Sequence, residues 1–102
     1  MGIGPDGHTA SLFPNAPALE IANRRAVAVE AGMEPHVPRV TMTLPVLAAA
    51  REMVYFVTGE SKAEAAERAF ALPPSPATPA SLVRGEKTVA ILDRAAAARL
   101  GQ

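Results

Sequence analysis

The sequence predicts a layered α/β fold with a largely parallel sheet. Short runs rich in valine and isoleucine alternate with segments that carry helix-start signals. The run Met53–Thr58 is apolar on both faces, which is typical of a central strand covered by helices on both sides. The 102 residues suffice for one small domain. We therefore expect three layers in the order helix, sheet, helix.

The N-terminal third is expected to hold more loop than regular structure. Residues 1–8 are rich in glycine, and we expect a short helical turn over Thr9–Phe13 that Pro14 ends. The alternating valines of Arg25–Glu30 predict a strand. A loop should follow over Gly32–Pro38, which contains one glycine and two prolines.

The middle of the chain carries the clearest helix and strand signals. Arg39–Thr43 alternates as a strand does, and Thr43 is placed to cap a helix that starts at Pro45 and runs to about Glu52. The strand Met53–Thr58 comes next and is bounded by a glycine. Ser61 and Glu64 form a capping-box pattern, and Glu64 with Arg68 is a favourable i,i+4 pair, so we expect a helix to about Leu72.

The C-terminal part is expected to return once to the sheet. A stiff connection with four prolines spans 73–79, and Ala80–Val83 predicts a helical turn. Thr88–Leu92 predicts the last strand. Asp93 can then cap a closing helix over Arg94–Leu100.

Composition excludes several classes of function. Ten Lys and Arg balance ten Asp and Glu without a basic run, so neither nucleic acid nor a membrane surface is expected as a primary partner. The chain has no cysteine, which excludes disulfides and thiolate chemistry and favours an intracellular, cytoplasmic protein. Much of the apolar content is alanine, which buries little area. We therefore expect a thin core and doubt that the chain is a self-sufficient unit.

The opening loop contains the most specific candidate residues. Residues 2–7 match the Gly-x-Gly-x-x-Gly pattern of dinucleotide sites, but no strand precedes them and no long helix follows, so we take the match as chance. Asp6 lies two residues before His8 on a glycine-rich backbone, which suits positioned acid/base chemistry. The residues alone leave open the alternative of an ordinary Asp-Gly turn followed by a structural histidine.

A second candidate feature follows the strand Met53–Thr58. Lys62 lies in the first turn of the expected helix, where a cation opposes the helix dipole unless an anion binds there. This indicates a phosphate site, although an exposed lysine remains the alternative. His36, between prolines, is expected to be structural or solvent-exposed, and Ser11 follows His8 too closely to suggest a nucleophile. No spacing of His, Asp or Glu predicts a metal site.

Four blocks together resemble the 6-phosphogluconolactonase family: residues 2–14, 39–47, 57–63 and 91–97. The first block is the most specific, because the related glucosamine-6-phosphate deaminases share the motif through the histidine and then diverge. Three positions depart from the family pattern: Asn15 replaces a common glycine, Ala48 an asparagine and Ala90 a tryptophan. The resemblance implies a three-layer α/β/α, Rossmann-like fold.

The resemblance also implies an activity and roles for residues. The family hydrolyses 6-phospho-D-glucono-1,5-lactone to 6-phosphogluconate, in the pentose phosphate pathway, without metal or organic cofactor. His8 would be the general base and Asp6 would orient it or the substrate. Lys62 and Arg39 would bind the 6-phosphate, and Gly4 and Gly7 would bring N–H groups to the developing oxyanion. A deaminase-like isomerase is the alternative activity.

The resemblance covers roughly the C-terminal half of the family. We therefore expect residues 1–102 to be the C-terminal portion of a 6-phosphogluconolactonase-like domain, truncated at the N-terminus. Two interpretations follow. Either the chemistry belongs to a longer parent or is completed by another chain, or this chain is an inactive fragment that persists as a small folded domain. Because a partial sheet leaves apolar strand edges uncovered, we expect self-association, most simply a homodimer.

Overall fold

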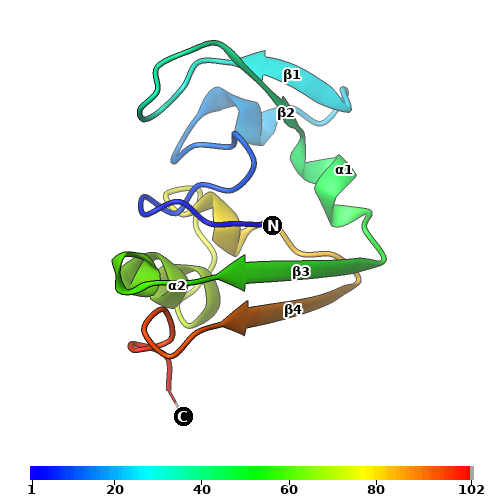
Figure 1. Cartoon of the computed structure of the whole chain (residues 1–102). Helices are drawn as coiled ribbons and strands as arrows, with labels where there is room; N and C mark the ends of the chain where they lie inside the picture. Colours follow the sequence, from blue (N-terminus) through cyan, green and yellow to red (C-terminus); the bar gives the residue numbers. More distant parts are fainter. Residues whose placement is uncertain (102) are drawn as a thin grey trace.

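Figure 1 shows the computed structural model of the chain, which describes residues 1–101. A pair of strands lies at each end of the view, and the N-terminal loop lies between them. The strands are β1 (Ala26–Val29), β2 (Arg39–Met42), β3 (Glu52–Val57) and β4 (Lys87–Leu92). The α-helices are α1 (Leu44–Ala48) and α2 (Ala63–Phe70), and the 3-10 helices are η1 (Pro17–Glu20), η2 (Glu60–Lys62) and η3 (Pro79–Ser81).

The two strand pairs differ in direction. β3 and β4 are parallel, with Glu52 opposite Lys87 and Val57 opposite Leu92. Parallel neighbours need a crossover, which η2, α2 and η3 provide. β1 and β2 form a separate antiparallel pair, with Ala26 opposite Met42. The α/β class is confirmed, and the parallel part of the sheet in this chain is the β3–β4 pair.

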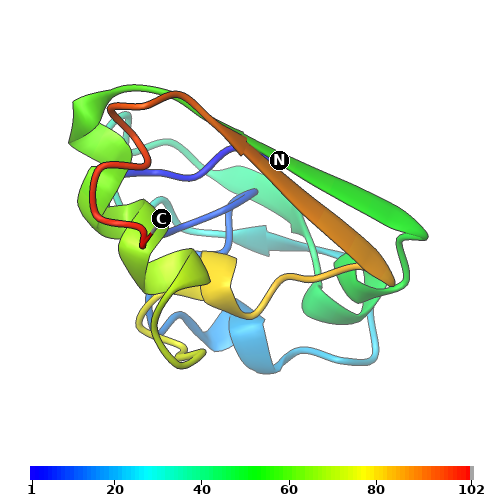
Figure 2. The same cartoon turned by 90° about the horizontal axis from the view of Figure 1, so that it is seen from below.

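The two faces of β3 differ in burial. Its buried face holds Met53, Tyr55 and Val57, whereas Val54 is 45% and Phe56 64% exposed. The facing residues of β4 on the exposed side are Val89 and Ile91, which are 41% and 50% exposed. In Figure 2, α2 and the rest of the chain lie on one side of the pair. The expectation of a strand covered on both faces is wrong for residues 1–101, because the described helices pack against one face only.

Tyr55 is the centre of the core. Its side chain is fully buried, and its hydroxyl donates to the carbonyl oxygens of Ala80 (3.2 Å) and Val83 (2.8 Å). Burial of the phenol raises the pKa of Tyr55 to about 12, against a smaller lowering effect of the Arg84 guanidinium. Much of the remaining core consists of alanines, among them three of the buried residues of α2, Ala65, Ala66 and Ala69.

Several helix predictions near turns are wrong. Thr9–Phe13 is a turn in which the Leu12 N–H donates to the Thr9 carbonyl (3.0 Å), because Ala10 takes a left-handed φ of +52° that no α-helix contains. Residues 94–99 are also turns: Asp93 caps the Ala96 N–H (2.8 Å) as expected, but so short a segment does not continue as a helix.

The helix starts also differ from expectation. The Thr43 hydroxyl donates to the Arg24 carbonyl (2.6 Å) instead of capping α1, which tethers this helix to the segment before β1. α1 ends at Ala48, since Glu52 already pairs with β4. The capping box is absent among the described residues: η2 occupies its place, and α2 begins at Ala63 without a side-chain cap. α2 ends at Phe70, two residues before the expected Leu72. Within residues 1–101, no helix has both the length and the apolar character needed to span a membrane.

Candidate active site

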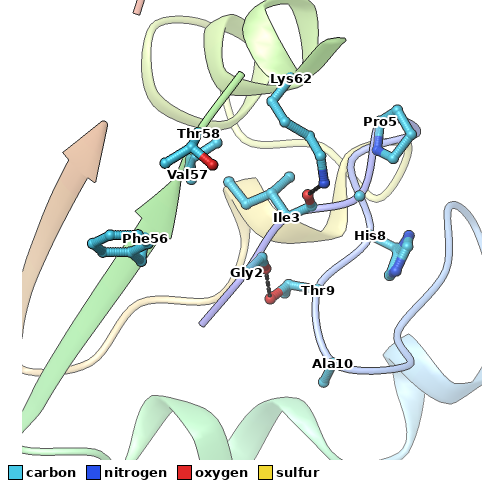
Figure 3. A pocket seen from close by; sticks show the side chains of 11 residues that line it. Gly2, Ile3, Pro5, His8, Thr9, Ala10, Phe56, Val57, Thr58 and Lys62 are labelled. Atoms are coloured by element: carbon cyan, nitrogen blue, oxygen red, sulfur yellow. Dashed lines mark hydrogen bonds between the residues drawn. The ribbon is translucent and has the colours of Figure 1, made fainter. Parts of the chain in front are cut away.

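An open pocket of about 480 Å³ lies between the N-terminal loop and the C-terminal end of β3 (Figure 3). The carboxyl ends of parallel strands are where α/β folds usually bind ligands. Its wall is formed by two stretches of the loop, the end of β3 and one residue of η2. The lining residues are Gly2, Ile3, Gly4, Pro5, His8, Thr9, Ala10, Phe56, Val57, Thr58 and Lys62.

The loop folds back on itself through two backbone hydrogen bonds. The Gly4 N–H donates to the His8 carbonyl (2.8 Å), and the Gly7 N–H donates to the Gly4 carbonyl (2.9 Å). Gly7 has a φ of +92°, and a Cβ at Gly4 would lie 2.1 Å from Cε1 of His8, so both positions require glycine. Both N–H groups are therefore already engaged. A role for Gly4 and Gly7 as oxyanion donors stays a prediction. It would require their N–H groups to leave the carbonyl oxygens of His8 and Gly4 and to donate to the oxyanion instead.

Asp6 and His8 form a close pair. Oδ1 of Asp6 lies 2.6 Å from Nδ1 of His8 and accepts the His8 backbone N–H at 3.0 Å. Burial by itself would raise the pKa of Asp6, but the hydrogen bonds and charge of His8 together lower it below its usual value. The carboxylate is thus held ionised against Nδ1. This arrangement favours a proton on Nδ1 and leaves Nε2 as the nitrogen that can accept a proton.

The structure separates the two cations that were expected to bind phosphate. Lys62 lines the pocket, and its Nζ donates to the carbonyl of Ile3 (Figure 3). Arg39 is outside the pocket lining: it donates to the Pro35 carbonyl (2.9 Å), and its guanidinium lies 5.7 Å from the centre of the Phe13 ring. The same Phe13 ring also contacts His8, whose ring centre lies 4.7 Å from that of Phe13.

Other residues support the pocket from outside, a role that the sequence pattern did not predict. Both carboxylate oxygens of Asp93 lie 3.1 Å from the Gly59 nitrogen, which fixes the turn between β3 and η2. Arg68 donates to the Pro5 carbonyl (3.3 Å). Thr58 is a lining residue that could have been found, because it directly follows a strand at the expected edge of the sheet.

The remaining sequence candidates lie outside the pocket lining. Nδ1 of His36 is 3.2 Å from a carboxylate oxygen of Glu34, and both side chains are exposed. The Ser11 N–H donates to the Thr41 hydroxyl (3.1 Å). Residues 1–101 contain no group of three or more His, Asp or Glu that could hold a metal ion. The arrangement thus offers a histidine held by a carboxylate and a lysine on the wall of the same pocket.

Comparisons with known proteins agree on one family. The family model of glucosamine-6-phosphate isomerases and 6-phosphogluconolactonase matches residues 1–91. The 6-phosphogluconolactonase of Bos taurus is 42% identical over 99 residues, which are 95% of this chain and 38% of that protein. The enzyme of the same name from Mycobacterium tuberculosis is 40% identical over 101 residues, which are 98% of this chain and 41% of that protein.

Solved structures give the same result for the fold. The 6-phosphogluconolactonase of Trypanosoma brucei superposes with a TM-score of 0.83 at 28% identity, covering 98% of this chain and 40% of that one. A monomeric glucosamine-6-phosphate deaminase superposes with a TM-score of 0.77 at 24% identity, which shows a shared fold alone. The chain spans about two fifths of the length of these relatives, between 38% and 45%.

Proposed function

Since the chain belongs to the glucosamine-6-phosphate isomerase and 6-phosphogluconolactonase family, we propose that it carries the reactive loop of a 6-phosphogluconolactonase. The reaction is the hydrolysis of 6-phospho-D-glucono-1,5-lactone to 6-phosphogluconate. The observation that carries the proposal is that His8, with Asp6 at 2.6 Å from its Nδ1, lines a pocket that Lys62 also lines. The correspondence of residues 1–102 to the C-terminal portion of the domain, and a cytoplasmic place of action, stay predictions from the sequence.

His8 is the general base of the proposed reaction. Its Nε2 takes a proton from a water molecule as the water oxygen attacks the lactone carbonyl carbon. The tetrahedral intermediate then breaks the bond to the ring oxygen, and the imidazolium returns the proton to that oxygen. The product is an open-chain hydroxy acid, and His8 is neutral again. Asp6 orients the imidazole and stabilises its charged form between the two steps.

Lys62 recognises the phosphate of the substrate. Its ammonium lies on the pocket wall, where a phosphate oxygen can accept a charge-assisted hydrogen bond. Arg39 packs on the Phe13 ring, which also contacts His8, and it supports the site through that ring. The deaminase-like activity is retained as the alternative, because the family model includes glucosamine-6-phosphate isomerases.

The test is a lactone assay on the 102-residue chain, corrected for spontaneous hydrolysis and run beside His8→Ala. We expect hydrolysis above background that the substitution abolishes. Equal rates for the two proteins would contradict the assignment of the base. Release of ammonia from glucosamine-6-phosphate, without lactone hydrolysis, would favour the alternative. Absence of both activities in a folded chain would identify it as an inactive fragment.

A second copy of this chain is the partner that we propose for the exposed face of β3 and β4. Val54, Phe56, Val89 and Ile91 form one apolar surface there, and the outer edge of β4 is unpaired within residues 1–101. We expect a dimer at tens of micromolar, measured by light scattering, that Ile91→Lys disrupts. Val40→Lys on β2 is the control, since Val40 is also exposed. A strictly monomeric wild-type chain would contradict this interface.

A further inference from the structure

One peptide group connects Lys62 to His8. Nζ of Lys62 donates to the carbonyl oxygen of Ile3, across 59 positions of sequence. That carbonyl and the N–H of Gly4 belong to the same planar peptide unit. The Gly4 N–H in turn donates to the His8 carbonyl at 2.8 Å. A lysine on the pocket wall is therefore linked, through two hydrogen bonds and one rigid plane, to the backbone of the histidine.

Two further hydrogen bonds, neither of which involves Lys62, hold the rest of the loop. The Ala80 N–H donates to the Gly7 carbonyl (3.0 Å), and the Thr9 hydroxyl donates to the Gly2 carbonyl (2.7 Å). These bonds fix the two ends of the loop against η3 and against itself. The contact of Lys62 therefore acts on the Ile3–Gly4 peptide between two anchored points, where a change in its strength is transmitted to His8.

The ammonium group has donors to spare. It carries three N–H bonds, of which the Ile3 carbonyl takes one, so a phosphate oxygen can be bound while the contact to the loop persists. Restraining a lysine side chain costs conformational entropy. Once either contact has restrained the lysine side chain, the other contact costs less conformational entropy, so the two contacts reinforce each other. Successive hydrogen bonds through a peptide group also polarise one another.

From these contacts we infer that Lys62 couples the phosphate of the ligand to the position of His8. Phosphate bound at Lys62 strengthens the hold on the Ile3–Gly4 peptide and so fixes the loop that carries the base. This inference rests on the proposed function for its substrate, and it adds that the phosphate accelerates the chemical step as well as increasing affinity. Because of Lys62, a lactone without phosphate should therefore have a lower kcat than the phosphorylated lactone, and not only a higher KM.

The first test uses inorganic phosphate and needs no catalysis. Hydrogen exchange at the Gly4 amide, followed by NMR, should slow about threefold or more when phosphate saturates the wild-type chain. Lys62→Met should remove this response. Lys87→Met is the matched control, because Lys87 begins β4 and is exposed away from the pocket lining. Phosphate that shifts the Lys62 resonances but leaves Gly4 exchange and the His8 resonances unchanged would overturn the coupling while leaving the phosphate site intact.

The second test is kinetic. Inorganic phosphate should raise kcat for unphosphorylated glucono-1,5-lactone by about tenfold in wild type and Lys87→Met, but not in Lys62→Met. If phosphate binds and leaves this rate unchanged, the coupling is wrong although lactone hydrolysis stands. If the exchange response is present and the chain hydrolyses neither lactone, the proposed function fails and the coupling stands. If phosphate does not bind up to tens of millimolar, the coupling fails together with phosphate recognition by Lys62.

Discussion

The junction of β3 with α2 and the start of β2 each carry a cation that was predicted to bind phosphate. The two cations have different surroundings in the structure. Lys62, at the junction, reaches the pocket wall and the Ile3 carbonyl. Arg39, at the start of β2, points to the same interior side as buried Thr41 and packs on Phe13. Its Nε is buried without a hydrogen-bond partner in the described chain.

The difference shows that position at the end of an element does not by itself place a side chain in a site. Lys62 follows a parallel strand, whose carboxyl end faces the ligand edge of the sheet. Arg39 begins an antiparallel strand that belongs to the other strand pair, so its neighbourhood depends on how the two pairs pack. His8 lies between these regions: it lines the pocket with Lys62 and contacts the Phe13 ring on which Arg39 packs.

The largest expected effect is at His8, where both regions meet. His8→Ala should lower kcat of lactone hydrolysis about 10²-fold or more, because general-base catalysis contributes that much. KM should change little, since the phosphate contact at Lys62 remains. Steady-state kinetics corrected for spontaneous hydrolysis measure both constants. A large rise in KM with unchanged kcat would instead make His8 a binding residue.

The next largest effect is on KM, and it should differ between substitutions of Lys62 and of Arg39. Lys62→Met should raise KM for the phosphorylated lactone about tenfold or more, through loss of a charge-assisted hydrogen bond, and lower kcat through the loop. Arg39→Met should leave KM within about twofold, because Arg39 acts through Phe13 and has no direct contact with the pocket. Equal rises in KM for the two variants would show that Arg39 also reaches the phosphate.

A smaller effect concerns the carboxylate beside His8. The pKa of Asp6 is lowered in the folded chain, so the unfolded chain binds the proton more readily. The contribution of the Asp6 carboxylate to stability is complete above its pKa in the unfolded chain, about 4. This contribution is lost as the pH falls through its lower pKa in the folded chain. Asp6→Asn should therefore lose less stability than wild type between pH 6 and pH 3, measured by urea unfolding. Parallel pH profiles would contradict this contribution of the Asp6–His8 pair.

The smallest expected effects are on the free energy of unfolding, at two residues with a positive φ. Ala10 lines the pocket with a φ of +52°, and Asn15 lies beyond it with a φ of +55°. Alanine bears the left-handed region at a cost of about 1–2 kcal/mol, whereas asparagine tolerates it better. Ala10→Gly should raise the free energy of unfolding by up to about 1 kcal/mol after the entropy that glycine adds to the unfolded chain. Asn15→Gly should change it by less, and a larger gain at Asn15 would contradict this reasoning.

Local patterns in the sequence predicted much of the framework. The alternation of valines placed β1 to within one residue at each end, and the strand signals placed β2, β3 and β4 similarly well. The spacing of Asp6 and His8 on glycines predicted a pair that the structure holds at 2.6 Å. Asn15, a departure from the family's common glycine, takes a positive φ that suits either residue. These features depend on residues within a few positions of one another.

Tertiary structure decided the features that depend on distant partners. The Thr43 hydroxyl binds the Arg24 carbonyl instead of capping its helix, and Asp93 holds Gly59 as well as its own turn. The choice of Lys62 over Arg39 as the cation of the pocket follows from the packing of the two strand pairs. The sequence by itself determined the strands, the loop and the pairing of Asp6 with His8, because local sterics and hydrogen bonding set them. Which polar groups meet across the chain was decided by folding, because burial forces each donor to find the nearest acceptor that packing provides.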